Sequence, residues 1–207
     1  MIIQYYGKQF FKIQQGDTTI AVNPVGKKSK IKAGKFGADI AISSLRHSDF
    51  DGVEELKYGD KVPFVVQGPG EYEIHNIFIK GLAIESSYGK ENKLNTVYSI
   101  LVDGINLAFL GVINSPDLPN EIKEMLDGID VLFVPVGGGE VLNHEEAHKL
   151  ATKLGAGIVI PMDYDDKALK LFLKEAGSED VKTLDKITLK KKDVEGKEGD
   201  VVVLKSL

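Results

Sequence analysis

The sequence predicts a single domain of the α/β or α+β class, and three observations support this prediction. The first half of the chain is rich in short strand-like segments, whereas the second half alternates between apolar strand-like and amphipathic helix-like segments. No Pro-, Gly- or Ser-rich linker divides the 207 residues, a length that suits one substantial core. We therefore expect one domain over residues 1–207, built from two packed sheets that helices cover.

Runs of apolar residues bounded by glycine, asparagine or aspartate turns predict the strands of the first half. The Asp103-Gly104 pair between two such runs is typical of a hairpin turn. The basic, glycine-punctuated stretch 26–37 is predicted to be a loop, and residues 53–57 a short helix. The predicted strands are one before Gly7 and then 10–13, 19–22, 38–42, 62–66, 72–75, 77–82, 96–102 and 107–110.

The second half is predicted to alternate between helices and buried strands. Helical spacing covers residues 117–126, 143–154 and 166–176, and Asn143 is the expected N-cap of the second of these helices. Asp165 and Asp166 stand where the N-terminal cap of the third helix is expected. The predicted strands are 131–135 and 158–161, followed by closing strands near 187–189 and 201–204.

Composition bounds the class of protein. An apolar fraction of 43% and a charged fraction of 28% are ordinary for a soluble globular protein, and no apolar run approaches the roughly 20 residues that span a membrane. The chain has no cysteine and its start lacks a secretory signal, so we expect a cytoplasmic protein without disulfides, thiolate metal sites or a membrane partner. The net charge of −5, spread over both signs, argues against nucleic acid as a partner.

The loop 42–52 is the first candidate for a functional site. It follows the predicted buried strand 38–42, and in mixed α/β folds sites are usually built on the loops at strand ends. The loop carries His47 and Asp49, two residues that can hold a metal ion or exchange a proton.

Within this loop, the segment Leu-Arg-His-Ser-Asp-Phe at 45–50 resembles, with losses, the His-x-His-x-Asp-His signature of the metallo-β-lactamase superfamily. It is similar to a compact lactonase-like branch, the Zn-dependent hydrolases of the β-lactamase fold. The resemblance implies a four-layer αββα sandwich, with the site at one edge between the two sheets. Further segments follow in the family's order: Gly-Pro-Gly-Glu-Tyr-Glu at 68–73, Leu-Gly at 110–111, Val-Pro-Val-Gly-Gly at 134–138 and Ile-Pro-Met-Asp-Tyr at 160–164.

In that family two metal ions share a bridging hydroxide that attacks a carbonyl or a phosphoester. Zinc held by imidazoles keeps an open position and lowers the pKa of its bound water towards ~7. The resemblance places the first metal's ligands at Leu45, His47 and Ser86 or its neighbour Glu85, the second metal's ligands at Asp49, Phe50 and Asp163, and the bridging aspartate at Val112.

Three of these positions hold apolar side chains, Leu45, Phe50 and Val112, which cannot coordinate a metal ion. Burial stabilises each large apolar side chain by about 1.5–3 kcal/mol, and an apolar pocket disfavours an ion. We therefore predict that no dinuclear zinc centre forms and that the protein needs no cofactor.

The remaining candidates for a rearranged or mononuclear site are His47, Asp49, Asp163 and Glu85, and the metal would then be zinc or manganese. Without a metal, His47 and Asp49 could form an acid–base pair, although a His–Asp contact that only stabilises the loop is the simpler interpretation.

Two other patterns suggest metal binding. His144-Glu-Glu-Ala-His148 matches the His-Glu-x-x-His helix motif, but His144 falls in the first helical turn and no later histidine offers a third ligand. We interpret it as an acidic helix start. An aspartate-rich group would suit a hard cation, although capping explains two of its members. The group comprises Asp49, Asp51, Asp163, Asp165 and Asp166.

The function predicted from the sequence is that of a degenerate metallo-β-lactamase-fold protein without dinuclear zinc hydrolase activity. It would act as a binding or interaction protein, through the former site cleft or as a homo-oligomer. The alternative is a metal-dependent hydrolase of a lactone, ester or phosphoester with a rearranged or mononuclear site. A small-molecule ligand is not identified by the sequence.

Overall fold

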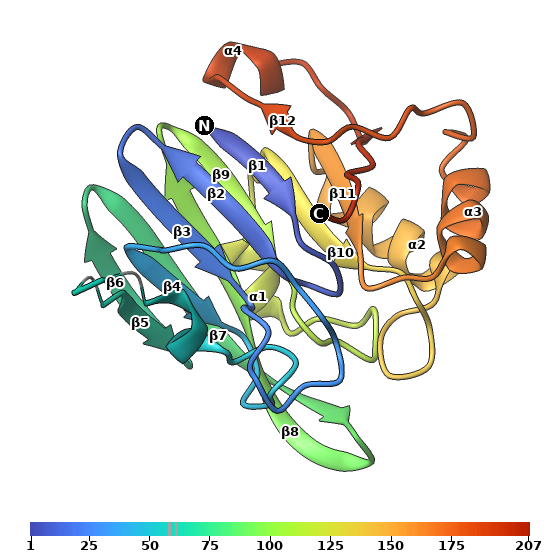
Figure 1. Cartoon of the computed structure of the whole chain (residues 1–207). Coiled ribbons are helices and arrows are strands. Elements are labelled where there is room, and N and C mark those ends of the chain that lie inside the picture. Colours follow the sequence, from blue (N-terminus) through green and yellow to red (C-terminus); the bar gives the residue numbers. More distant parts are fainter. Residues whose placement is uncertain (58, 61) are drawn as a thin grey trace.

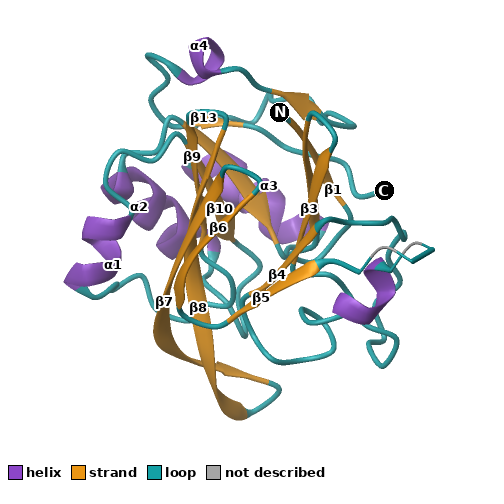
Figure 2. Cartoon of the chain, turned by 90° about the vertical axis from the view of Figure 1, so that its left-hand side faces the viewer, coloured by secondary structure: helices purple, strands orange, loops and turns teal. Residues whose placement is uncertain are grey.

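Alternating apolar and polar residues build two β-sheets that pack face to face, as Figures 1 and 2 show. The computed structural model describes residues 1–57, 59, 60 and 62–207. The first sheet has the strand order β12-β1-β2-β3-β4-β5, and the second β13-β11-β10-β9-β8-β7-β6. The strands of the first sheet are β1 (Ile2–Tyr5), β2 (Phe11–Gln15), β3 (Thr18–Val22), β4 (Ile40–Ser43), β5 (Phe64–Gln67) and β12 (Ile187–Thr188). Those of the second are β6 (Gly70–Ile74), β7 (Ile77–Tyr88), β8 (Glu91–Val102), β9 (Ile105–Phe109), β10 (Val131–Pro135), β11 (Ile158–Met162) and β13 (Asp200–Val201).

The main core lies between the sheets and is formed by the inward-facing residues of both. Phe11 of the first sheet meets Phe133 of the second edge to face, with ring centroids 4.7 Å apart. Both rings are buried, as are neighbours such as Ile13 and Ile160. This apolar interface fixes the two sheets against each other.

The outer faces of the two sheets are covered differently. Helices α1 (Asn120–Met125), α2 (His144–Leu154) and α3 (Asp166–Glu175) pack on the second sheet and bury a second apolar cluster. The loop 24–39 and the 3₁₀ helix η1 (Val53–Leu56) cover the first sheet. The short helix α4 (Lys191–Val194) follows β12 near the end of the chain (Figure 1).

Most predicted elements are confirmed, and the differences have clear physical causes. Strands β7 and β8 are longer than predicted, because their polar ends pair with each other beyond the sandwich from Glu85↔Leu94 to Tyr88↔Glu91. Glu85 and Ser86 therefore lie within β7. The helix predicted for 117–126 begins only at Asn120, because Pro119 is extended with ψ 152°. The closing strands are only two residues long.

Parallel strands bring several loops to one edge of the sandwich. Strand β4 runs parallel to β3, and β10 runs parallel to β9 and β11. Hydrogen bonds fix the loops that follow these strands: the Ser44 carbonyl accepts from the Thr96 amide of β8, and the Ile113 carbonyl accepts from the Leu142 amide in the loop after β10. This edge is where the sequence predicts the functional site.

No helix in the described part of the chain is both long and apolar enough to cross a membrane.

Helix α2 begins with the predicted cap. The Asn143 Oδ1 accepts from the Glu146 amide at 3.0 Å, and the Glu146 carboxylate accepts from the Asn143 amide at 3.1 Å. This reciprocal pair satisfies two amides that the helix itself leaves unpaired.

Replacing Asn143 with alanine is expected to lower the free energy of unfolding by about 1 kcal/mol, because α2 loses its side-chain cap. Urea unfolding monitored by circular dichroism measures this loss. Asn143→Asp keeps an acceptor at the cap and is the control. A loss in N143D as large as in N143A would mean that the cap is not its source.

Candidate functional site

Buried polar side chains fix the loop after β4 against its neighbours. The Ser44 amide donates to the Asn23 Oδ1 at 2.7 Å, and the Asn23 amide group donates to the Ser44 hydroxyl at 2.8 Å. Gly111, which follows β9 of the second sheet, packs against this loop and has φ +65°. A Cβ at Gly111 would lie 2.3 Å from the Asn95 Oδ1. Only glycine fits this close approach without displacing the amide.

The centre of the site is an apolar cluster. Leu45, Phe50, Tyr88, Val112 and Val141 pack together, and each is 7% exposed or less. The Phe50 and Tyr88 rings meet edge to face at 4.9 Å. Three of the five stand where the resemblance implied metal ligands, so apolar packing occupies those positions.

His47 and Asp49 lie together at the rim of this cluster. The His47 Nδ1 is 3.6 Å from the Asp49 Oδ2 and also accepts from the Asp49 amide at 3.2 Å. The Asp49 carboxylate accepts from the Ser29 hydroxyl at 2.5 Å and from the Tyr88 hydroxyl at 2.7 Å. Burial and the hydrogen bond to the Asp49 carboxylate raise the pKa of Tyr88, so its hydroxyl stays a donor. Both carboxylate oxygens of Asp49 thus have protein partners.

Asp163 directly follows β11 and is 7% exposed. One carboxylate oxygen is 2.6 Å from the Lys8 ammonium, and the other accepts from the Gln9 side chain at 2.8 Å. The Lys8 Nζ also lies 5.8 Å from the ring centroid of Phe50 and 5.4 Å from that of Tyr88. The predicted metal ligand Asp163 is therefore the counter-ion of a lysine.

Ser86, which the resemblance placed at the third ligand position of the first metal, forms hydrogen bonds within the protein. The Ser86 Oγ lies 2.6 Å from the Val112 carbonyl oxygen and 2.7 Å from the Asn114 Oδ1, so it serves as a donor to the neighbouring loop. Glu85 is exposed on β7 and lines an open cleft of about 510 Å³ with Ser87 and Lys93.

The donor set does not fit two metal ions. Leu45, Phe50 and Val112 offer no ligand atom, and Asp49 and Asp163 accept hydrogen bonds or ion pairs through both oxygens. Zinc sites demand three or four N, O or S ligands in a fixed geometry. Among the described residues, the five aspartates that suggested a hard cation do not bring three ligand atoms within 4.8 Å of one another.

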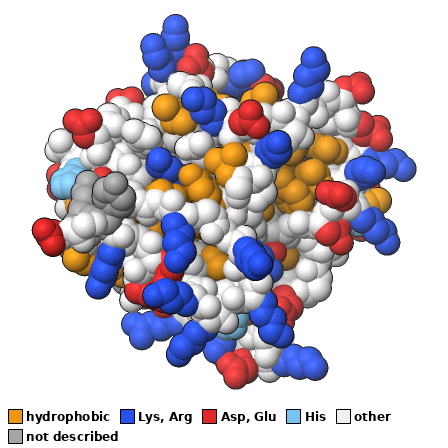
Figure 3. All heavy atoms as spheres, in the orientation of Figure 1, with side chains coloured by type: hydrophobic (Ala, Val, Ile, Leu, Met, Phe, Trp, Pro, Cys, Tyr) orange, Lys and Arg blue, Asp and Glu red, His pale blue; other side chains and the backbone are white. Residues whose placement is uncertain are grey.

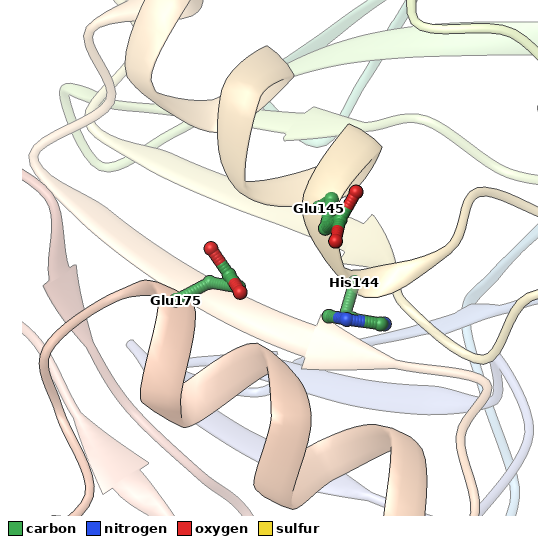
Figure 4. Close-up of side chains that lie close together, drawn as sticks. All are labelled: His144, Glu145 and Glu175. Atoms are coloured by element: carbon green, nitrogen blue, oxygen red, sulfur yellow. The ribbon is translucent and has the colours of Figure 1, made fainter.

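A different group lies on the helical side of the molecule. His144 and Glu145 at the start of α2 and Glu175 at the end of α3 have ligand atoms within 4.8 Å of one another. Figure 4 shows these three side chains on the two helices. His148 is not part of this group; it lines a separate cavity of about 440 Å³ with residues such as Phe172 and Glu198. Glu175 could not be associated with the motif from sequence, because the packing of α3 on α2 supplies it.

The family model described as the β-lactamase superfamily domain matches residues 2–163. A metal-dependent hydrolase of Listeria monocytogenes serotype 4b is 28% identical over 196 residues, covering 80% of this chain and 86% of that protein. A Thermotoga maritima protein assigned to the Zn-dependent hydrolases of the metallo-β-lactamase superfamily superimposes with a TM-score of 0.77 at 26% identity, covering 98% of this chain and 97% of that one. A Parabacteroides distasonis protein assigned as a metal-dependent hydrolase gives a TM-score of 0.66 at 17% identity, covering 99% and 92%.

Replacing Tyr88 with phenylalanine is expected to lower the free energy of unfolding by about 2 kcal/mol, because the buried end of Asp49 loses a charge-assisted hydrogen bond. Urea unfolding at neutral pH measures the change. Tyr6→Phe is the control, since no hydrogen bond of the Tyr6 hydroxyl occurs among the described residues. Equal losses in both variants would show that the Asp49 contact does not stabilise the site.

Proposed function

Because the chain belongs to the β-lactamase superfamily but has apolar residues at three metal-ligand positions, we propose that it is a degenerate member without dinuclear zinc hydrolase activity. It acts instead as a binding or interaction protein. The observation that carries this proposal is the burial of Leu45, Phe50 and Val112 in one cluster. A bridging hydroxide needs two ions held by donor atoms, and this cluster supplies none.

A cleft beside the site supports a binding role. It has a volume of about 190 Å³ and adjoins the larger cleft at Glu85, with which it shares Lys93 and Leu94. Arg46 adds a second basic side chain to its lining, and Leu94 is 57% exposed. Basic groups beside an exposed apolar side chain suit a small ligand with an anionic group and an apolar part.

The second candidate is a metal-dependent hydrolase of a lactone, ester or phosphoester, and the relatives from Listeria monocytogenes and Thermotoga maritima favour it. Its site would be rearranged or mononuclear, with zinc or manganese held by His47, Asp49 and Asp163 and possible help from Glu85. It requires Asp163 to exchange Lys8 for the metal ion.

The proposal extends to location and partners. We place the protein in the cytoplasm, where it associates with further copies of itself rather than with membranes or nucleic acid. On the face shown in Figure 3, lysine side chains are spread among acidic ones and form no basic stripe, which agrees with a net charge of −5.

Metal content tests the two candidates directly. Protein expressed with Zn²⁺ and Mn²⁺ and then desalted is expected to carry well below one ion per chain in elemental mass spectrometry, because the donor set is incomplete. His47→Ala is the matched control. One or more ions per chain, lost in H47A and accompanied by turnover in an ester and phosphoester screen, would establish the hydrolase instead.

A further inference from the structure

Lys8 carries a positive charge into the site from an element that the sequence motifs do not include. It follows β1 in the turn before β2, and its ammonium lies 2.6 Å from the Asp163 Oδ1. The side chain of Lys8 is 23% exposed and that of Asp163 8%. Because it is so little exposed, the Asp163 carboxylate would be strongly destabilised by desolvation if it had no cation beside it.

The ammonium lies close to the residues that the resemblance assigned to one metal ion. The family resemblance placed the second metal between Asp49, Phe50 and Asp163. The Lys8 Nζ contacts Asp163 and lies over the ring of Phe50 at 5.8 Å from its centroid. It also lies over the ring of Tyr88, whose hydroxyl binds Asp49. The ammonium thus binds Asp163 and lies over the ring of Phe50, and Tyr88 links it to Asp49.

The backbone holds Lys8 in this place. The Lys8 carbonyl accepts from the Asp163 amide at 2.6 Å and from the Tyr5 hydroxyl at 2.8 Å. Lys8 and Asp163 both have φ +55°, a conformation that costs energy in residues other than glycine. Lys8 and Asp163 are thus joined by a backbone hydrogen bond as well as by their side chains, and both adopt an unfavourable φ. We conclude that the fold specifies this pairing and that it is not a chance surface contact.

We infer that the Lys8 ammonium takes the place of the second metal ion and is the permanent counter-ion of Asp163. The protein's own side chain therefore supplies the positive charge of the site. This inference deepens the proposed function and rests on it for the loss of the metal. Asp163 serves as the partner of Lys8, and the site is closed by an internal ion pair as well as by the apolar cluster.

Lys8→Ala and Lys12→Ala form a matched pair of variants. Both remove a lysine that lies over an aromatic ring, since the Lys12 Nζ is 5.3 Å from the ring centroid of Phe36. Only K8A leaves a buried carboxylate without its cation. In urea unfolding, K8A is expected to lower the midpoint clearly more than K12A, and K8A/D163N is expected to recover part of that loss, because the second change removes the orphaned charge.

Zn²⁺ titration followed by calorimetry tests the replacement itself. K8A is expected to bind Zn²⁺ at least about tenfold more tightly than the wild-type protein, and K8A/D163N to lose this gain, because the freed carboxylate is the new ligand. K12A is expected to match the wild type. If K8A does not fold, Lys8→Met, which fills the space of the side chain, and its D163N double variant carry the stability test.

The outcomes separate the inference from the proposed function. Equal Zn²⁺ affinity in wild type and K8A, or a K8A/D163N variant that is no more stable than K8A, would overturn the role of Lys8. Stoichiometric metal in the wild-type protein would overturn the proposed function, whatever the stability of the Lys8 variants.

Discussion

The edge of the sandwich depends on keeping the buried Asp163 carboxylate satisfied. Its two oxygens bind Lys8 and Gln9, and Gln9 in turn accepts from Asn23, whose side chain bonds Ser44 in the loop after β4. Gln9 and Asn23 are fully buried. Within the described residues, no buried side-chain nitrogen or oxygen atom lacks a partner. Removing one member of such a network leaves the others unpaired, so the network acts as a unit.

The polar network and the apolar cluster divide the site between them. The network ties the first sheet to the loop after β11, whereas the apolar cluster combines residues from both sheets and the loops after their strands: Leu45, Phe50, Tyr88, Val112 and Val141. Tyr88 belongs to both, because its ring packs in the cluster and its hydroxyl binds Asp49. The polar groups and the apolar packing at this edge are therefore coupled through one side chain.

The sequence predicted the fold well because its signals are local. Strand alternation and helix caps each act within a few residues. Alternation located most of the strands, and the Asn143 and Asp165 caps were found where predicted. Leu45, Phe50 and Val112 are apolar at the positions that the resemblance assigned to metal ligands, and the structure packs them in one cluster. The loss of the metal centre stays a prediction.

What the sequence could not supply depends on contacts between distant segments. Lys8 lies 155 residues from Asp163, and nothing in the turn after β1 marks it as part of a site. The extension of β7 and β8 was missed for the opposite reason. Residues 85–87 and 91–93 are polar, because that part of the hairpin extends beyond the sheets (Figure 1), and only Tyr88 between them packs in an apolar cluster.

The close packing of loops at this edge has a consequence for how the protein tolerates change. A Cβ at Gly137 would lie 2.1 Å from the Asp163 carbonyl oxygen, and one at Gly111 would meet the Asn95 side chain. Glycine offers no side chain for chemistry, yet neither position has room for a larger residue. In a library of random variants, these glycines would be as intolerant as catalytic residues. Intolerance at this edge therefore measures how tightly the backbone is packed, and it is no guide to whether the chain turns over a substrate.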